Sequence, residues 1–208
     1  AFHAEDEYRL EERKPVRVKG DPRSHPVWRD VETALQCTRR LVKIAREKRA
    51  KIHVLHISTG EEIDFLRDHK NVASVEVTPH HLTLDASLYA TIGTKLQMNP
   101  PVRDIRHQKH IWWGLEQGIA DILGSDHAPH TLAEKARGYF EAPSGLPLVQ
   151  HSLLMLLEQH RQGLYTLPKI VEKAAHNPAT LFGIVDRGFV REGYFADLVA
   201  VDLNKPTR

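Results

Sequence analysis

The sequence has little cysteine, little net charge and no long apolar run. Cys37 is the one cysteine among 208 residues, which excludes an internal disulfide and is typical of the reducing cytoplasm. With neutral histidine the net charge is +2, so no basic surface predicts a nucleic-acid partner. No run approaches the roughly 18 apolar residues of a membrane span, so no membrane partner is predicted either. These absences favour an ordinary cytoplasmic globular chain.

Histidine, in contrast, is abundant, with 14 residues. The most informative occurrence is the segment GSDHAPH, Gly124 to His130, which follows an apolar run that reads as a buried strand. Asp126 and two imidazoles therefore stand at a strand exit, a combination that suits a metal site that also moves protons. Taken alone, a capping aspartate beside solvated histidines explains this segment equally well.

Three further segments repeat the pattern and weaken the capping explanation. His3, His56 and the pair His80-His81 each stand where a β-branched or apolar run stops. In a parallel α/β barrel the carboxyl ends of the strands meet at one face, which is where such enzymes place their sites. We therefore expect these side chains to gather at one mouth of a sheet.

The fold predicted from the pattern is α/β, because strands alternate with helices along the chain. The units amount to about half of a TIM-like (β/α)8 barrel, which needs roughly 250 residues. The chain is therefore expected to be either an internal piece of a longer enzyme or an enzyme chain that has lost its ends. We predict strands over 52–57, 72–78 and 119–125, helices over 26–48, 61–69, 105–117, 147–161 and 167–175, and a tail of strand and turn over 188–203.

The motifs of the chain resemble those of dihydroorotases, in the cyclic amidohydrolase superfamily, from Phe2 to about Leu203. The segments HNPATLFG and REGYFADLVAVD are similar to the superfamily's passage from the last barrel helix into a small β-domain. The resemblance implies a metallo-dependent hydrolase barrel, with residues 1–183 as its C-terminal half and 184–208 as part of a small β-sandwich domain. The other motifs, in the family's order, are HAED (3–6), HIST (56–59), TPHHL (78–82), MNPPVR (98–103), GSDHAPH (124–130) and APSGLPL (142–148).

The resemblance also implies roles for single residues. His3 and His56 match two metal ligands of a binuclear zinc site. Asp126 matches a ligand of the other metal that also serves as the catalytic base and acid. The HxH pair and the bridging ligand of the family have no match here, so the missing N-terminal half of the barrel would have to supply them. The substrate contacts implied are Asn99, His130, Ala142 and Gly145.

The function that the resemblance implies is zinc-dependent hydrolysis of a cyclic amide. The expected reaction is the reversible interconversion of dihydroorotate and N-carbamoyl-aspartate in pyrimidine biosynthesis, with a small-molecule substrate and a homo-oligomeric enzyme. Two alternatives stay open. One is an allantoinase- or hydantoinase-like enzyme, and the other is a non-catalytic dihydroorotase-like scaffold that binds a partner such as a transcarbamoylase.

Other polar residues near the motifs favour supporting roles. His53 is expected to be structural, since it lies three residues from His56 and so points to the other face of the strand. His80 and His81 are expected to pack or to support a ligand, and His127 to support the loop around Asp126. Solvated or supporting roles are expected for Glu5 and Asp6, and solvated positions on helix faces for His69, His107, His110 and His160.

Overall fold

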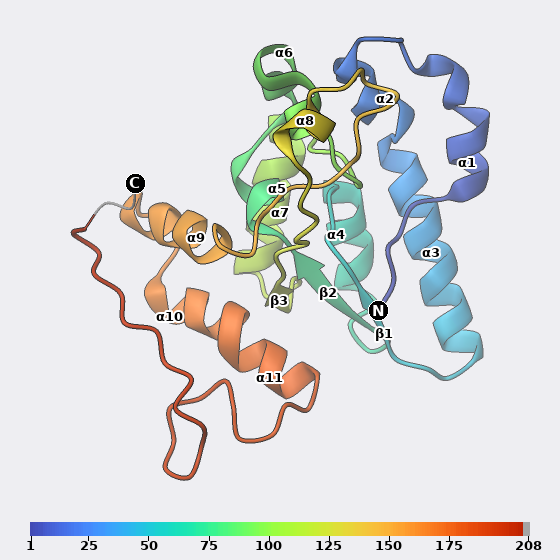
Figure 1. Cartoon of the computed structure of the whole chain (residues 1–208). Coiled ribbons are helices and arrows are strands. Elements are labelled where there is room, and N and C mark those ends of the chain that lie inside the picture. The colour runs from blue at the N-terminus through green and yellow to red at the C-terminus, as the bar shows by residue number, and fades with distance from the viewer. Residues whose placement is uncertain (206–208) are drawn as a thin grey trace.

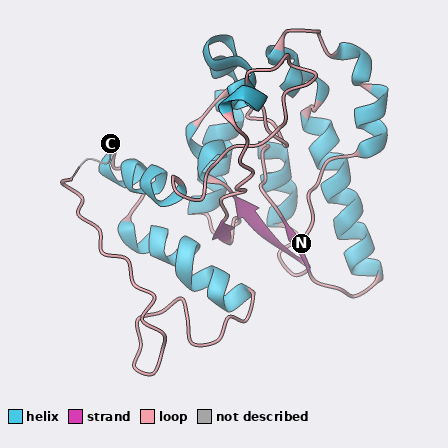
Figure 2. Cartoon of the chain, viewed as in Figure 1, coloured by secondary structure: helices cyan, strands magenta, loops and turns pink. Residues whose placement is uncertain are grey.

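The computed structural model describes residues 1–205 and has a three-stranded parallel sheet with helices against it (Figures 1 and 2). The strands β1 (Ile52–Val54), β2 (Ala73–Val77) and β3 (Ile122–Leu123) neighbour each other in chain order. Phe2 extends this order by a parallel bridge to Val54. Four consecutive parallel segments, joined by helical connections, make the wall of a partial barrel.

The helices follow the strands as the alternation predicts, with shorter segments at the loops. The longer helices are α3 (Val31–Glu47), α4 (Gly60–Arg67), α7 (Ile105–Glu116) and α9 (Ser152–Arg161). The short ones are α1 (Glu7–Glu12), α2 (His25–Trp28), α5 (Pro79–Thr83), α6 (Tyr89–Ile92), α8 (Leu132–Lys135), α10 (Leu167–Val171) and α11 (Asn177–Leu181). The 3₁₀ segments are η1 (Lys14–Val16), η2 (Pro22–Ser24), η3 (Ala86–Leu88) and η4 (Gly93–Leu96), and η5 (Glu172–His176) is a short π-helix.

The helix predicted to run unbroken from Pro26 is wrong, because the chain forms α2 and α3 with a break between them. Asp30 has an extended backbone, and its carboxylate accepts the backbone N–H of Thr33, which makes it the N-cap of α3. Arg9 also donates to both oxygens of this carboxylate, at 2.9 and 2.5 Å. The break places α2 and Arg29 beside the mouth of the sheet rather than along its outer wall.

The two faces of the sheet differ in character because side chains alternate along each strand. Val75 and Val77 are fully buried in the main core, where α3, α4 and α7 contribute Val42, Ile63, Leu66, Ile111 and Leu115. The opposite face is polar. There the imidazole of His53 lies 2.8 Å from the hydroxyl of Ser74 and 3.6 Å from the carboxylate of Glu76.

The expected strands in the tail are wrong for this structure, since residues 184–205 contain no strand. Val190, Leu198 and Val199 are 85, 66 and 74% exposed, and few backbone hydrogen bonds hold the segment. A strand forms only against a partner strand, and the described chain offers none to this tail. The boundary predicted at residue 184 stays a prediction, and residues 206–208 of that domain lie outside the described residues. Among residues 1–205 no helix is both long and apolar enough to span a bilayer.

Candidate active site

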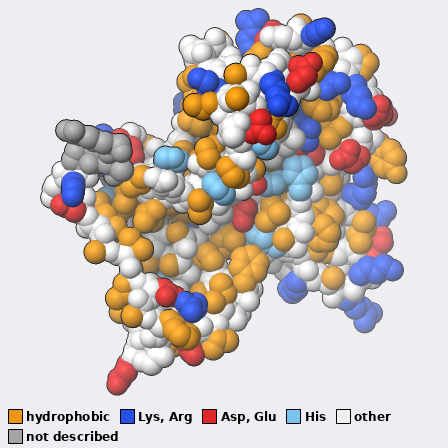
Figure 3. All heavy atoms as spheres, in the orientation of Figure 1, with side chains coloured by type: hydrophobic (Ala, Val, Ile, Leu, Met, Phe, Trp, Pro, Cys, Tyr) orange, Lys and Arg blue, Asp and Glu red, His pale blue; other side chains and the backbone are white. Residues whose placement is uncertain are grey.

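The structure brings His3 and His56 together at the mouth of the sheet. Phe2 pairs with the strand before His56: its N–H donates to the carbonyl of His53 and its carbonyl accepts the N–H of Leu55. Both imidazoles therefore leave the sheet at the same level. Nδ1 of His3 lies 3.0 Å from Nε2 of His56. In the space-filling view, histidine side chains gather near the middle of the visible face (Figure 3).

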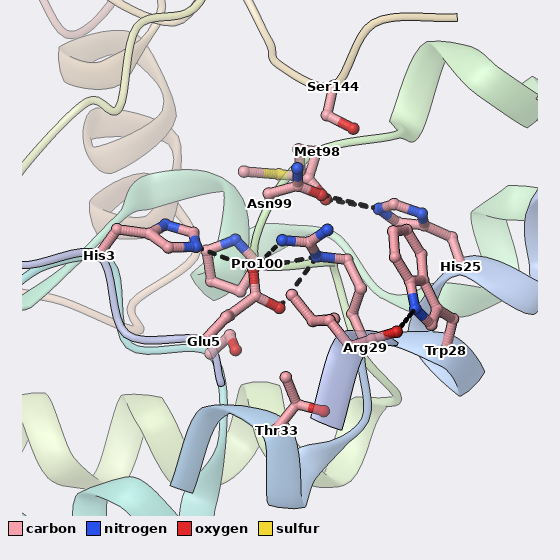
Figure 4. A network of polar contacts seen from close by, with 12 residues as sticks. His3, Glu5, His25, Trp28, Arg29, Thr33, Met98, Asn99, Pro100 and Ser144 are labelled. Atoms are coloured by element: carbon pink, nitrogen blue, oxygen red, sulfur yellow. Dashed lines mark hydrogen bonds and ion pairs between the residues drawn. The ribbon is translucent and has the colours of Figure 1, made fainter. Parts of the chain in front are cut away.

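A buried ion pair orients the ring of His3. Its Nε2 lies 3.0 Å from Oε2 of Glu5, and Arg29 donates to both oxygens of the same carboxylate, at 3.0 and 2.6 Å (Figure 4). Burial alone would raise the pKa of Glu5, but the hydrogen bond with His3 and the charge of Arg29 outweigh it and lower that pKa to about 2. Since Glu5 is ionised, Nε2 of His3 carries a proton and Nδ1 presents its lone pair toward His56.

His56 and Asp126 share an unusual backbone conformation. Their φ angles are +36° and +45°, in the left-handed region that L-residues other than glycine rarely adopt. Strain of this kind concentrates at functional sites. Burial is the main cause that lowers the pKa of His56, the neighbouring imidazole of His3 acts in the same direction when it is protonated, and the Asp126 carboxylate partly opposes this shift. The neutral imidazole that results is the form that binds a metal.

The two imidazoles fit part of a zinc site. Ligand nitrogens about 2.0–2.1 Å from one tetrahedral ion lie about 3.3 Å apart, close to the observed 3.0 Å between His3 and His56. Residues 1–205, however, contain no group of three His, Cys, Asp or Glu side chains close enough to hold an ion. The described residues thus bring His3 and His56 together, but Asp126, the third predicted ligand, does not complete a group of three with them.

The residues predicted to contact the substrate lie on loops that are joined to each other. His130 approaches the carbonyl of Ser144, with its Nε2 3.2 Å from that oxygen. Gly145 has φ +146°, and a Cβ there would lie 2.5 Å from the carbonyl of Ala128 and 3.1 Å from Nε2 of His130. Its own N–H donates to the carbonyl of Gln97, two residues before Asn99. The loop can therefore close this tightly only with glycine at position 145.

Lys135 is a member of this arrangement that the sequence analysis missed. It is 5% exposed, and its ammonium donates to the carbonyls of Gln97, Pro143 and Gly145 at 2.7, 2.9 and 3.2 Å. The side chain of Gln97 adds a hydrogen bond of 2.9 Å to the carbonyl of Ala142. No sequence signal marks a lysine whose partners are all backbone carbonyls. It fastens the predicted substrate loop to the Asn99 segment.

The environments of three further histidines bear on their predicted roles. The solvated position predicted for His107 is wrong, because this side chain is 2% exposed and its Nδ1 accepts the N–H of Gly60 at the start of α4. His80 and His81 are buried, and Thr78 lies within hydrogen-bond distance of both rings. This geometry is that of packed histidines at the end of β2.

Buried neutral histidines should make the fold sensitive to acid. Burial lowers the pKa of His25 to about 4, that of His81 to about 3 and that of His80 well below its usual value. Because the unfolded chain binds these protons near pH 6.5, stability falls as pH drops from about 6.5 toward 4, by up to about 1.4 kcal/mol per pH unit for each histidine. Urea unfolding across this range should show a falling midpoint, and His81→Asn should flatten the fall. Substitution of the exposed His151 by glutamine should leave the fall unchanged, and an unfolding midpoint independent of pH would contradict the expectation.

Comparison with known proteins identifies the class. The model of the amidohydrolase family matches residues 8–208, and the chain belongs to this family. It is 36% identical over 200 residues to the dihydroorotase of Halobacterium salinarum, a match that covers 96% of this chain and 46% of that protein. It is also 36% identical over 172 residues to the dihydroorotase of Latilactobacillus sakei, covering 80% of this chain and 40% of the relative. The resemblance predicted from the motifs is confirmed.

Solved structures confirm the fold class. The L-hydantoinase (dihydropyrimidinase) of Arthrobacter aurescens matches with a TM-score of 0.88 at 25% identity, over 93% of this chain and 46% of that structure. A D-hydantoinase (dihydropyrimidinase) from Thermus sp. matches with a TM-score of 0.86 at 24% identity, over 93% of this chain and 45% of that structure. The chain thus spans less than half the length of these relatives, and the sheet described above corresponds to part of their fold.

Proposed function

We propose that the complete protein is a zinc-dependent cyclic amide hydrolase that interconverts dihydroorotate and N-carbamoyl-aspartate. The observation that carries the proposal is the pair His3 and His56, whose ring nitrogens face each other at 3.0 Å at the strand exits, with the charge of Asp126 acting on His56. The similarity to proteins named dihydroorotase supports the choice of substrate.

In the proposed ring-opening reaction, the residues of this chain bind the metal ion and the substrate and transfer a proton. In ring opening, the oxygen of water bonds to the ring carbonyl carbon, the carbon–nitrogen bond breaks, and a proton passes to the leaving nitrogen. A bound zinc ion lowers the pKa of water to about 7 and polarises a carbonyl. His3 and His56 would hold such an ion. Asp126 would take the proton of the attacking water and deliver it to the ring nitrogen.

Substrate choice is assigned to the loops around His130. Dihydroorotate carries a carboxylate, which hydantoin and dihydrouracil lack. His130 and Asn99 offer hydrogen-bonding groups beside a loop whose backbone, from Ala142 to Gly145, is fastened by Lys135. We propose that this group of residues recognises the carboxylate and the ring.

Each alternative rests on its own observation. A hydantoinase-like substrate is favoured by the structural matches to hydantoinases. A scaffold without catalysis is favoured by the incomplete donor set among residues 1–205. The geometry at His3 favours the enzyme over the scaffold, because the buried Glu5–Arg29 ion pair holds this imidazole with Nδ1 toward His56, as metal binding would require.

The setting of the enzyme is part of the same proposal. The reaction places it in pyrimidine biosynthesis, and the single half-buried thiol of Cys37 is suited to the cytoplasm. The homo-oligomeric state rests on the resemblance to dihydroorotases alone. The complete protein would have to supply the remaining metal ligands.

The proposal is tested by assaying ring opening and ring closure with the complete protein. We expect turnover of dihydroorotate and of N-carbamoyl-aspartate, loss of both after treatment with a chelator, and recovery with zinc. Turnover of hydantoin or allantoin without dihydroorotate would favour the other enzymes. A fully metal-loaded protein that is inactive on all these substrates would favour the non-catalytic scaffold.

A further inference from the structure

His25 occupies a closed polar environment next to Asn99. It is the first residue of α2 and is 1% exposed. Its Nε2 lies 2.9 Å from the carbonyl oxygen of Met98 and 3.1 Å from Oδ1 of Asn99, and its Nδ1 lies 3.1 Å from the hydroxyl of Tyr139. Figure 4 shows the ring of His25 pointing at Met98 and Asn99 from the side opposite to His3.

The partners decide where the proton of His25 sits. The carbonyl of Met98 can only accept a hydrogen bond, so Nε2 must carry the proton. Nδ1 then has a free lone pair and accepts a hydrogen bond from the hydroxyl of Tyr139. Burial lowers the pKa of the ring to about 4, so a second proton is absent at neutral pH. His25 is thus a neutral donor at Nε2.

This donor in turn decides how the amide of Asn99 lies. The single N–H at Nε2 is shared between the carbonyl of Met98 and the side chain of Asn99. The branch toward Asn99 needs the carboxamide oxygen opposite it, because an amino group there would set two donors against each other. The amino group of Asn99 is therefore turned away from His25. Within residues 1–205 this amino group has no hydrogen-bond acceptor, and Asn99 is only half-buried, so the group is open to a ligand.

We propose that His25 is a positioning residue that fixes the Asn99 carboxamide with its amino group toward the substrate. Asn99 then acts as a donor, and the site selects ligands with an oxygen acceptor at that point, a carboxylate or a ring carbonyl. The inference rests on the proposed function, in which Asn99 contacts the substrate. His25 itself touches no substrate and acts through Asn99.

The first test is a double-mutant cycle in the complete protein with dihydroorotate as substrate. His25→Leu removes the donor and should raise KM on the order of tenfold, about one hydrogen bond, with a much smaller change in kcat. His25→Gln, whose amide can replace the Nε2 donor, should recover most of the loss. In an Asn99→Ala background, His25→Leu should add nothing to KM.

Additive effects in the cycle would overturn the inference, because they would show that His25 acts on the fold and not through Asn99. Equal damage from His25→Leu and His25→Gln would overturn it as well. His151→Gln, at an exposed position just before α9, is the matched histidine control and should leave KM unchanged.

The second test needs no turnover. In the nitrogen NMR spectrum of the imidazole, His25 should stay neutral and protonated at Nε2 from about pH 7 to about pH 5.5. A ring protonated at Nδ1, or charged at pH 6, would contradict the inference. A complete protein that does not turn over dihydroorotate would contradict the proposed function. The nitrogen spectrum would still show whether His25 is neutral and protonated at Nε2.

Discussion

Asp126→Asn in the complete protein is expected to lower kcat for dihydroorotate by about 10³-fold or more. The substitution keeps the size of the side chain but removes the group that accepts the proton of water and returns it to the ring nitrogen. It also weakens a predicted metal ligand, since an amide is neutral. Measurement of kcat together with zinc content separates the two contributions.

The matched control is Asp68→Asn. Asp68 is an aspartate whose side chain is 73% exposed, with Arg67 as its ionic partner and no contact with the site. The Asp68→Asn variant should leave kcat, KM and zinc content unchanged. Asp126→Asn with near-normal turnover would show that the proton moves through another group and would remove Asp126 from the mechanism.

The second large effect concerns substrate preference. The unmodified complete protein should prefer dihydroorotate over dihydrouracil by several orders of magnitude in kcat/KM, because a site built to bind a carboxylate is left with unpaired groups when that carboxylate is missing. His130→Ala should erode this preference, and it should do so by lowering kcat/KM for dihydroorotate while that for dihydrouracil changes little.

His151→Ala is the control for this experiment, because His151 is an exposed histidine just before α9 whose side chain makes no capping bond. It should keep the preference intact. Comparable kcat/KM values for the two substrates in the unmodified protein would exclude the dihydroorotase activity and favour a hydantoinase-like one. A His130→Ala variant with an unchanged preference would move carboxylate recognition to another residue.

Much of the fold could be predicted because it depends on patterns local to the sequence. The apolar runs at 52–57, 72–78 and 119–125 contain the three strands, although β3 is shorter than its run. The unbroken helix from Pro26 failed because one side chain, Asp30, ends the first turn by capping the next helix. The strands of the tail failed because strand formation needs a pairing partner, which local pattern does not reveal.

The candidate site likewise contains residues that the sequence pattern predicts and residues that it does not. Topology alone predicts that His3 and His56 meet, since both follow neighbouring parallel segments. Arg29 and His25 could not be predicted, because their partners stand 24 and 74 residues away and no spacing rule links them. Lys135 is harder still, because its acceptors are carbonyls, which every residue has.

The cation at Lys135 bears on how ligands enter and leave. Opening the loop from Pro143 to Gly145 would break charge-assisted hydrogen bonds from one ammonium to three carbonyls, and would leave that charge buried without partners. Such a loop is poorly suited to be a lid that swings on the timescale of turnover. If this loop contacts the substrate ring as proposed, we expect ligand entry and release to depend on the motion of other segments around the site.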